Sequence, residues 1–298
     1  MNGKGGFMYY KFCVCIFCLV CFYIQSCNKP ARKGLDKQEV QPLVNTDTIP
    51  KAWPDITYHY LAIDRKHVDT PDRGLNIILA LNRIDLNNLR RKDTLVVPDS
   101  FYLDTRVYSP FPPYIEELKP VKKLIFYSYR VEAFGAYENG RLIRWGPVSM
   151  GKQSTPTPTG LFHTNWRSKK TTSTVNSDWI MEWYFNLENS LGVSMHEFDL
   201  PGYPASHACV RLSEEDAMWF FDWCEQWKLE KATTIKAYGT PVIIFGIYHF
   251  DRKKPWLLLP ENNKATTVTG TELIKELEPV LPKILERQAA RDSLNISS

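Results

Sequence analysis

Alternating apolar and polar residues predict short β-strands through the middle of the chain. Neighbouring side chains of a strand point to opposite faces, so a period of two marks a strand with one buried face. Asn139 and Gly140, which both tolerate positive φ, stand between two such runs and predict a tight hairpin. The pattern therefore indicates a mainly β domain. The strand-like runs are residues 123–127, 131–137, 141–145, 179–187 and 240–248.

Apolar residues spaced three and four apart predict a few helices. One such stripe covers residues 77–84, and another begins after Ser213, which has the residue type of a helix N-cap. Residues 271–291 predict an amphipathic tail helix that two prolines interrupt. The prolines of residues 111–120 predict a linker in front of the β domain.

The start of the chain predicts an export signal. Two lysines precede an unbroken apolar run, residues 12–24, which is shorter than the about 20 residues that a membrane-spanning helix needs. Residues 24–27, with the sequence IQSC, then resemble a bacterial lipobox. In that interpretation the signal of residues 1–26 is removed and Cys27 receives a lipid anchor. A plain secretory signal is the alternative.

The remaining boundaries follow from composition. Residues 27–55 contain scattered prolines and little apolar periodicity, which predicts a tether. We expect a small α+β segment over residues 56–115, the β domain over residues 121–249 and a helical extension over residues 250–298. Removal of the signal takes away two of the 37 basic residues and none of the 33 acidic ones. The near-neutral mature chain has no clustered basic stripe, so no nucleic-acid partner is expected.

The candidate chemistry is concentrated in residues 206–211, Ser-His-Ala-Cys-Val-Arg. A cysteine thiolate is a strong nucleophile, and an imidazole can take the thiol proton. His207 and Cys209 stand two positions apart and would share one face of an extended strand. This spacing predicts a Cys–His pair in which the pKa of Cys209 lies below its free value. An isolated pair of this kind is more often structural, but a second histidine, a serine and an arginine near the same thiol favour chemistry.

His196 and the block Ser206-His207-x-Cys209-x-Arg211 resemble the signature of L,D-transpeptidases, the cysteine enzymes that cross-link bacterial peptidoglycan. The resemblance covers the β domain. It implies an L,D-transpeptidase-like mixed β-sandwich with a few short helices, working without a cofactor or a metal. The other matching segments are residues 138–142, 146–151, 155–160 and 239–244.

The resemblance also implies a role for each side chain. Cys209 would be the nucleophile and His207 its base, while backbone N–H groups of their turn would bind the oxyanion. Ser206 and His196 would orient the base and frame the substrate carbonyl. Arg211 would either anchor the loop through backbone carbonyls or meet a substrate carboxylate.

Ala208 departs from the family pattern, which has glycine between the histidine and the cysteine. If the position requires positive φ, alanine stores strain of about 1 kcal/mol there. If the position requires only space, the methyl group narrows the pocket. Every reacting side chain is present, so we expect activity to be retained.

Only two of the seven cysteines, Cys209 and Cys224, lie beyond Cys27. A disulfide between them would silence the nucleophile. Cys224, however, falls on the apolar stripe of the helix after Ser213, which predicts inert packing. A zinc site built from Cys209 with His163, His196 and His207 is an alternative, although the chain lacks a paired zinc-binding motif.

Residues 56–115 resemble the second half of a LysM peptidoglycan-binding module. The likeness lies in the helix over residues 77–84, a Leu-Asn pair and the closing Leu-Val-Val-Pro strand at residues 95–98. The alternative is a subdomain that packs on the β domain.

Together these features predict an L,D-transpeptidase of the cell envelope. The family resemblance implies the substrates: the donor would be a peptidoglycan tetrapeptide stem, cut before its terminal D-Ala, and the acceptor the side-chain amine of a second stem. The protein would be lipid-anchored through Cys27 on the periplasmic side, or secreted. Two alternatives remain: an L,D-carboxypeptidase of the same fold that uses water, and a non-catalytic peptidoglycan-binding lipoprotein.

Overall fold

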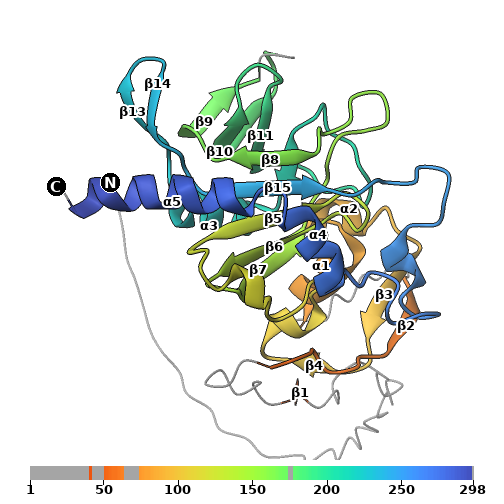
Figure 1. Cartoon of the computed structure of the whole chain (residues 1–298). Helices are drawn as coiled ribbons and strands as arrows, with labels where there is room; N and C mark the ends of the chain where they lie inside the picture. The colour runs from red at the N-terminus through yellow and green to blue at the C-terminus, as the bar shows by residue number, and fades with distance from the viewer. Residues whose placement is uncertain (1–39, 42–49, 64–73, 174–176, 297–298) are drawn as a thin grey trace, which may run out of the picture. The chain divides into compact units, whose positions relative to one another are not determined.

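The computed structural model describes residues 40–41, 50–63, 74–173 and 177–296 (Figure 1). The export signal and the lipid-accepting Cys27 lie outside the described residues, as does most of the expected tether. Within the described ranges, no helix has the length and apolar character needed to cross a membrane.

Two β-sheets form the centre of the structure, which confirms the expected mainly β fold. One sheet has five strands in the order β7-β6-β5-β15-β8, and the other has four in the order β12-β11-β10-β9. The first sheet contains β5 (Leu124–Ser128), β6 (Ala133–Glu138), β7 (Arg141–Pro147), β8 (Gly160–His163) and β15 (Pro241–Phe245). The second contains β9 (Arg167–Thr172), β10 (Ile180–Glu188), β11 (Val193–Glu197) and β12 (Val210–Leu212).

The main hydrophobic core lies between these two sheets, together with helix α3 (Glu214–Trp223). In β5, Ile125 and Tyr127 point into this core, whereas Leu124 and Phe126 point into a second core on the opposite face. Both faces of the strand are buried, and its first four residues accordingly form a continuous apolar run. The five-stranded sheet is therefore the middle layer of the structure.

The predicted local signals are found in place. The β6–β7 hairpin turns at Asn139 and Gly140, with φ of 46° and 83°. Ser213 caps α3, and its hydroxyl accepts a hydrogen bond from the backbone N–H of Asp216. Cys224 caps the other end of α3 and is buried, whereas Cys209 is half-buried. Both thiols are free, so the two cysteines form no disulfide.

The N-terminal segment is built from two paired strands with two helices between them. Strand β2 (Tyr58–Ala62) runs antiparallel to β3 (Thr94–Pro98), and α1 (Leu75–Asn82) and α2 (Leu86–Leu89) lie between them in sequence. The segment packs directly on the β domain: the buried Arg83 donates from Nε to the carbonyl of Val131 at 2.8 Å. Short pieces complete this region: β1 (Val40–Gln41), β4 (Phe101–Tyr102) and the 3-10 turns η1 (Thr105–Tyr108) and η2 (Glu116–Leu118).

Residues 111–120 do not form the linker that their prolines predicted. Phe111, Ile115 and Leu118 are buried in the second core, and the amide of Leu142 in β7 donates to the carbonyl of Pro113. Prolines mark irregular backbone, but they do not tell whether the apolar residues between them are buried.

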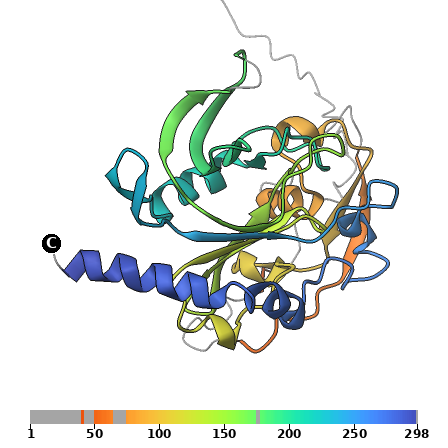
Figure 2. The same ribbon diagram turned by 45° about the horizontal axis from the view of Figure 1, so that its top comes forward.

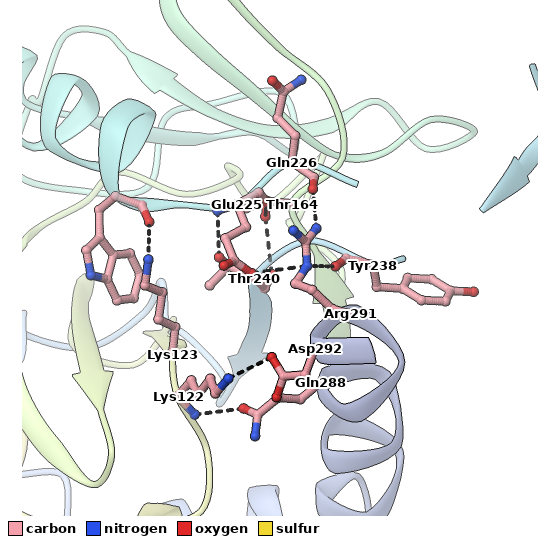
Figure 3. Close-up of polar contacts among 11 residues, drawn as sticks. Lys122, Lys123, Thr164, Glu225, Gln226, Tyr238, Thr240, Gln288, Arg291 and Asp292 are labelled. Carbon is pink, nitrogen blue, oxygen red and sulfur yellow. Dashed lines mark hydrogen bonds and ion pairs between the residues drawn. The ribbon is translucent and has the colours of Figure 1, made fainter. Parts of the chain in front are cut away.

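The C-terminal extension covers the second core. Helices α4 (Gly270–Leu277) and α5 (Leu281–Ile296) are separated at Pro279, which confirms the expected interruption, whereas Pro282 lies in the first turn of α5. Figure 2 shows both helices on the side of the five-stranded sheet away from β9 and β10. Arg291 of α5 donates to the carbonyl of Tyr238 at 2.8 Å and pairs with Glu225, while Asp292 pairs with Lys122 (Figure 3). The remaining elements are β13 (Lys228–Lys231), β14 (Thr234–Ala237) and η3 (Pro255–Leu258).

Candidate active site

The pocket-facing side of the four-stranded sheet carries the candidate residues. In β12, Val210 and Leu212 point into the core, so Arg211 points the other way, on the side of Cys209. Strand β11 lies parallel to β12, with His196 opposite Arg211. These side chains line one cavity of about 400 Å³ together with His207.

The Cys209 thiol contacts Gly192 in the β10–β11 turn and Ser194 in β11. Its Sγ accepts a hydrogen bond from Ser194 Oγ at 3.1 Å and donates to the carbonyl of Gly192 at 3.4 Å. Burial raises the pKa of Cys209, and the Ser194 hydrogen bond and the field of Arg211 offset this only in part. The expectation of a lowered pKa for Cys209 was therefore wrong, because desolvation disfavours the thiolate.

His207 is paired with a lysine instead of with the thiol. Lys152 Nζ lies 3.0 Å from His207 Nε2, and the indole of Trp179 packs against the ring with centroids 5.0 Å apart. A lysine ammonium only donates, so Nε2 accepts and the proton of the neutral ring sits on Nδ1. Nδ1 is buried without a hydrogen-bond partner among the described residues. Burial and the charge of Lys152 both lower the pKa of His207.

The expected strand alternation across His207 and Cys209 is interrupted by Ala208. This residue has φ of 77°, in the left-handed region, and β12 begins only at Val210. Both side chains reach the cavity, but no hydrogen bond joins them. The backbone at Ala208 thus requires positive φ, so alanine stores strain at this position.

His196 is held in the same tautomer as His207, but its Nε2 is not engaged by a lysine among the described residues. Its Nδ1 lies 2.7 Å from the carbonyl of Glu197, which can only accept, so Nδ1 carries the proton and Nε2 keeps its lone pair. The ring is buried, stacked near Tyr184 and edge-on to Phe198. Burial lowers the pKa of His196 to about 4, so the ring is neutral at pH 7.

The other two candidates shape the loop. Ser206 is buried, and its hydroxyl donates to the carbonyl of Cys209, which ties the turn together. Its backbone pairs with Met150 and Lys152, so the residue 152–160 loop lies against the site. Arg211 stacks over Phe198, with its guanidinium carbon 4.5 Å from the ring centroid.

The N-terminal segment holds the loop that leads to these residues. Asp85 caps α2 with one carboxylate oxygen and accepts the amide N–H of Leu200 with the other at 2.7 Å. Lys92 donates to the carbonyl of Pro201, and Asn88 donates to Asp199. The segment therefore supports the active-site loop directly.

Two residues of the site were not found from the sequence. Ser194 precedes His196 by two positions, so strand alternation could have placed it on the same face. Lys152 had no such signal, because a loop brings it to His207 across 55 residues. Within the described ranges, no three His, Cys, Asp or Glu side chains gather as metal ligands would.

Comparisons with known proteins agree with the motif. Residues 128–244 match the family model of the YkuD L,D-transpeptidase catalytic domain. L,D-transpeptidase 1 of Mycobacterium tuberculosis, in strain H37Rv and in strain CDC 1551, is 30% identical over 112 residues, in a match that covers 32% of this chain and 44% of the relative. The match thus spans less than half the length of these curated relatives.

Solved structures show a weaker likeness. Mycobacterium tuberculosis L,D-transpeptidase 1 is 27% identical over 42% of this chain and 62% of its own, with a TM-score of 0.32. An L,D-transpeptidase from Mycobacterium smegmatis is 20% identical over 42% and 59%, with a TM-score of 0.33. These low scores add nothing to the sequence match. That match, together with the SHxCxR block inside it, identifies residues 128–244 as a catalytic domain of the L,D-transpeptidase family.

Proposed function

We propose that this chain is an L,D-transpeptidase that acts on peptidoglycan stem peptides through a thioester on Cys209. The observation that carries the proposal is the cavity itself. It brings a thiol and two imidazoles together in about 400 Å³, within the range of ordinary small-ligand sites. The family match supports the choice of substrate class.

We assign the base to His196 in place of His207. A general base needs a free lone pair, and His196 Nε2 keeps one because Nδ1 is bound to the Glu197 carbonyl. The lone pair of His207 is already used by Lys152, and its free Nδ1–H can only donate. His207 is therefore not available as the base.

The reaction follows from these roles. His196 takes the proton of Cys209, and the thiolate attacks the carbonyl carbon of the donor amide. The C–N bond breaks, the terminal amino acid leaves with the proton from His196, and a thioester remains. The amine of a second stem then attacks the thioester, forms the new amide and returns the thiol.

The turn before β12 supplies donors for the oxyanion. The backbone N–H groups of Ala208 and Cys209 have no acceptor among the described residues. They lie beside the thiol, where negative charge develops on the substrate oxygen. Loss of one donor in such sites costs roughly 10²–10³ in rate.

The cell-envelope location belongs to the same proposal. An enzyme that cross-links peptidoglycan stems in the wall works outside the cytoplasm. The export signal, with Cys27 as the lipid acceptor, would hold it at the membrane. Mass analysis of the mature N-terminus from membranes tests this: a diacylated Cys27 supports the anchor, and an unmodified soluble form contradicts it.

Intact-mass measurement of purified protein tests the thioester. Incubation with a tetrapeptide ending in D-Ala should add the mass of the acyl tripeptide, and Cys209→Ala should abolish the adduct. Cys224→Ala is the matched control, because this buried thiol has no part in the site. No adduct on the wild-type protein would contradict the proposal.

Two further comparisons sharpen the result. His196→Gln should stop adduct formation, whereas His207→Gln should slow it; the reverse order would restore His207 as the base. Cross-linked dimers among the products identify a transpeptidase, and free tripeptides alone identify the hydrolase alternative.

A further inference from the structure

Ser194 places its hydroxyl against the sulfur of Cys209. Ser194 lies in β11 and is fully buried, and its Oγ is 3.1 Å from Cys209 Sγ. The thiol proton points to the carbonyl of Gly192, 3.4 Å away, and a carbonyl can only accept. The sulfur therefore accepts at its other contact, and the single hydroxyl proton of Ser194 is directed at it.

Tyr184 stands behind this hydroxyl. The side chains of Tyr184 and Ser194 share a hydrogen bond. Because the proton of Ser194 already points to the sulfur, its oxygen accepts and Tyr184 Oη donates. Tyr184 Oη in turn accepts from Nδ2 of Asn186 at 3.2 Å. The phenol thus receives one proton and passes on its own.

The orientation of Asn186 is fixed by groups outside the cavity. Its Nδ2 also donates to the backbone carbonyl of Glu188 at 3.3 Å, and its Oδ1 accepts from Nδ2 of Asn165 at 2.9 Å. Both asparagines are buried, and the backbone N–H of Asn165 donates to the carbonyl of Asn186. Four residues therefore form a donor chain that points throughout towards the sulfur: Asn165, Asn186, Tyr184 and Ser194.

A bulge in β10 brings two members of the donor chain to the cavity. The pairing of β10 with β11 shifts register beside Trp183, whose φ of 51° lies in the left-handed region. Met181 before the bulge, and Tyr184 and Asn186 after it, all line the cavity. A regular strand would keep a step of two and turn Tyr184 to the other face. Bulges and costly backbone conformations of this kind are concentrated at functional sites.

We propose that Ser194 is a further catalytic residue, which donates a hydrogen bond to the thiolate of Cys209. Tyr184 and Asn186 are positioning residues that hold the Ser194 hydroxyl in its donating direction. This role rests on the proposed function, because it takes Cys209 as the nucleophile. A hydrogen bond to an ion is stronger than one to a neutral acceptor, so the contact strengthens when the thiol loses its proton to His196. Polarisation along the donor chain adds to this effect.

The charges near the thiol stay in place when the Ser194 hydroxyl is removed. Burial raises the pKa of Cys209, while the hydroxyl of Ser194, its backbone N–H and the charge of Arg211 lower it. Burial lowers the pKa of Arg211 in turn, and Asp199 opposes this by stabilising the guanidinium charge. Substitution of Ser194 by alanine keeps the backbone N–H and both charges. A change in the titration of Cys209 therefore reports on the hydroxyl.

The other titratable side chains of the cavity keep their protonation where a thiol titrates. Burial lowers the pKa of His196 to about 4. Burial and the charge of Lys152 lower the pKa of His207, so both rings are neutral. Burial raises the pKa of Tyr184, so its hydroxyl keeps the proton that it donates. The reactivity of Cys209 as a function of pH therefore follows the thiol itself.

The pH dependence of alkylation by iodoacetamide tests the proposal without a peptide substrate. The rate at Cys209 is followed by peptide mass spectrometry from about pH 6 to pH 11, a range that brackets the free thiol pKa of about 8.5. A hydrogen bond to an ion predicts that Ser194→Ala lowers the thiolate fraction about 10- to 100-fold at pH values below the midpoint. The midpoint of the rate profile should therefore rise by about 1–2 on the pH scale.

Matched variants assign the rise to the hydroxyl. Ser194→Thr keeps the hydroxyl and should restore most of the wild-type midpoint. Tyr184→Phe keeps the ring and removes the donor behind Ser194, so the midpoint should rise by up to about a third of the Ser194→Ala change. Ser128→Ala is the control, because Ser128 is a buried serine of β5 that does not line the cavity and whose hydroxyl has no partner among the described residues. Its midpoint should equal that of wild type.

Three outcomes would overturn the proposal. They are an unchanged midpoint in Ser194→Ala, an equal rise in Ser128→Ala, and no restored midpoint in a Ser194→Thr protein that unfolds at the wild-type Tm. A merely structural role of Ser194 predicts the first of these, with a lower Tm. If Ser194→Ala does not fold, Tyr184→Phe decides: a raised midpoint supports the proposal, and an unchanged midpoint overturns it.

The thioester experiment on wild-type protein reports separately on the proposed function. A peptide adduct together with an unchanged midpoint in Ser194→Ala leaves the transpeptidase proposal standing and removes the role of Ser194. A raised midpoint without any peptide adduct on the wild-type protein does the opposite.

Discussion

Replacement of Ala208 by glycine should stabilise the protein, although glycine normally destabilises. Ala208 has φ of 77°, a conformation that an L-residue with a Cβ adopts at a cost and that glycine adopts freely. The residue sits between His207 and Cys209, so the strain lies in the turn that presents the nucleophile. Relief of this strain is the perturbation that the variant introduces.

The expected gain is the difference between two opposing effects. The left-handed conformation costs alanine roughly 1–2 kcal/mol. Glycine adds conformational freedom to the unfolded chain, which costs about 0.4–1 kcal/mol on folding. We therefore expect Ala208→Gly to raise the free energy of unfolding by about 0.5–1 kcal/mol. For a chain of this size, that corresponds to a Tm higher by roughly 1–4 °C.

Ala205→Gly provides the control in the same loop. Ala205 is also half-buried, but its φ is not in the positive region, and the backbone N–H that it donates to Ser149 Oγ is kept by glycine. This variant carries the entropic cost of glycine without relief of strain, so its Tm should fall. The difference between the two variants isolates the strain at Ala208 at about 1–2 kcal/mol.

Thermal unfolding followed by circular dichroism, with urea titration as a second probe, measures both variants under one set of conditions. A Tm that falls as far in Ala208→Gly as in Ala205→Gly would show that Ala208 is unstrained. Adduct formation at Cys209 should persist in Ala208→Gly, since no reacting side chain changes.

Three further predictions follow from the contacts described above. Lys152→Met should raise the pKa of His207, because a neighbouring positive charge is removed; NMR titration of the ring proton measures it, and an unchanged pKa contradicts the pairing. Asp85→Ala should lower the free energy of unfolding by about 1–3 kcal/mol, since it removes both the α2 cap and the acceptor of the Leu200 amide; a urea midpoint equal to wild type would refute this. Burial lowers the pKa of His163 to about 3, so the ring is neutral in the folded protein and binds a proton more readily in the unfolded chain. The stability that His163 contributes to folding is therefore complete above about pH 6.5 and is lost as the pH falls towards 3. Between pH 7 and pH 5 this amounts to about 2 kcal/mol, and His163→Gln should show a smaller loss of stability over that interval than wild type.

Local chemistry alone determined much of this protein. The Asn139-Gly140 turn and the Ser213 cap involve groups within three residues of one another, so their sequence was enough to predict them. The strand-like run of residues 123–127 located β5, although all five residues of β5 are buried in place of the expected alternation, because layers cover both faces of the sheet. The Ser206–Arg211 block likewise indicated Cys209 as the candidate nucleophile and pointed to the family.

The tertiary structure decided how the site works. Sequence proximity suggested that His207 serves Cys209, but the positive φ of Ala208 breaks the alternation that the suggestion required. Lys152, carried by a distant loop, then contacts His207 Nε2, and the carbonyl of Glu197 fixes the tautomer of His196. Tautomers, pKa values and free donors depend on groups that folding brings together from distant parts of the chain, and no local pattern encodes them.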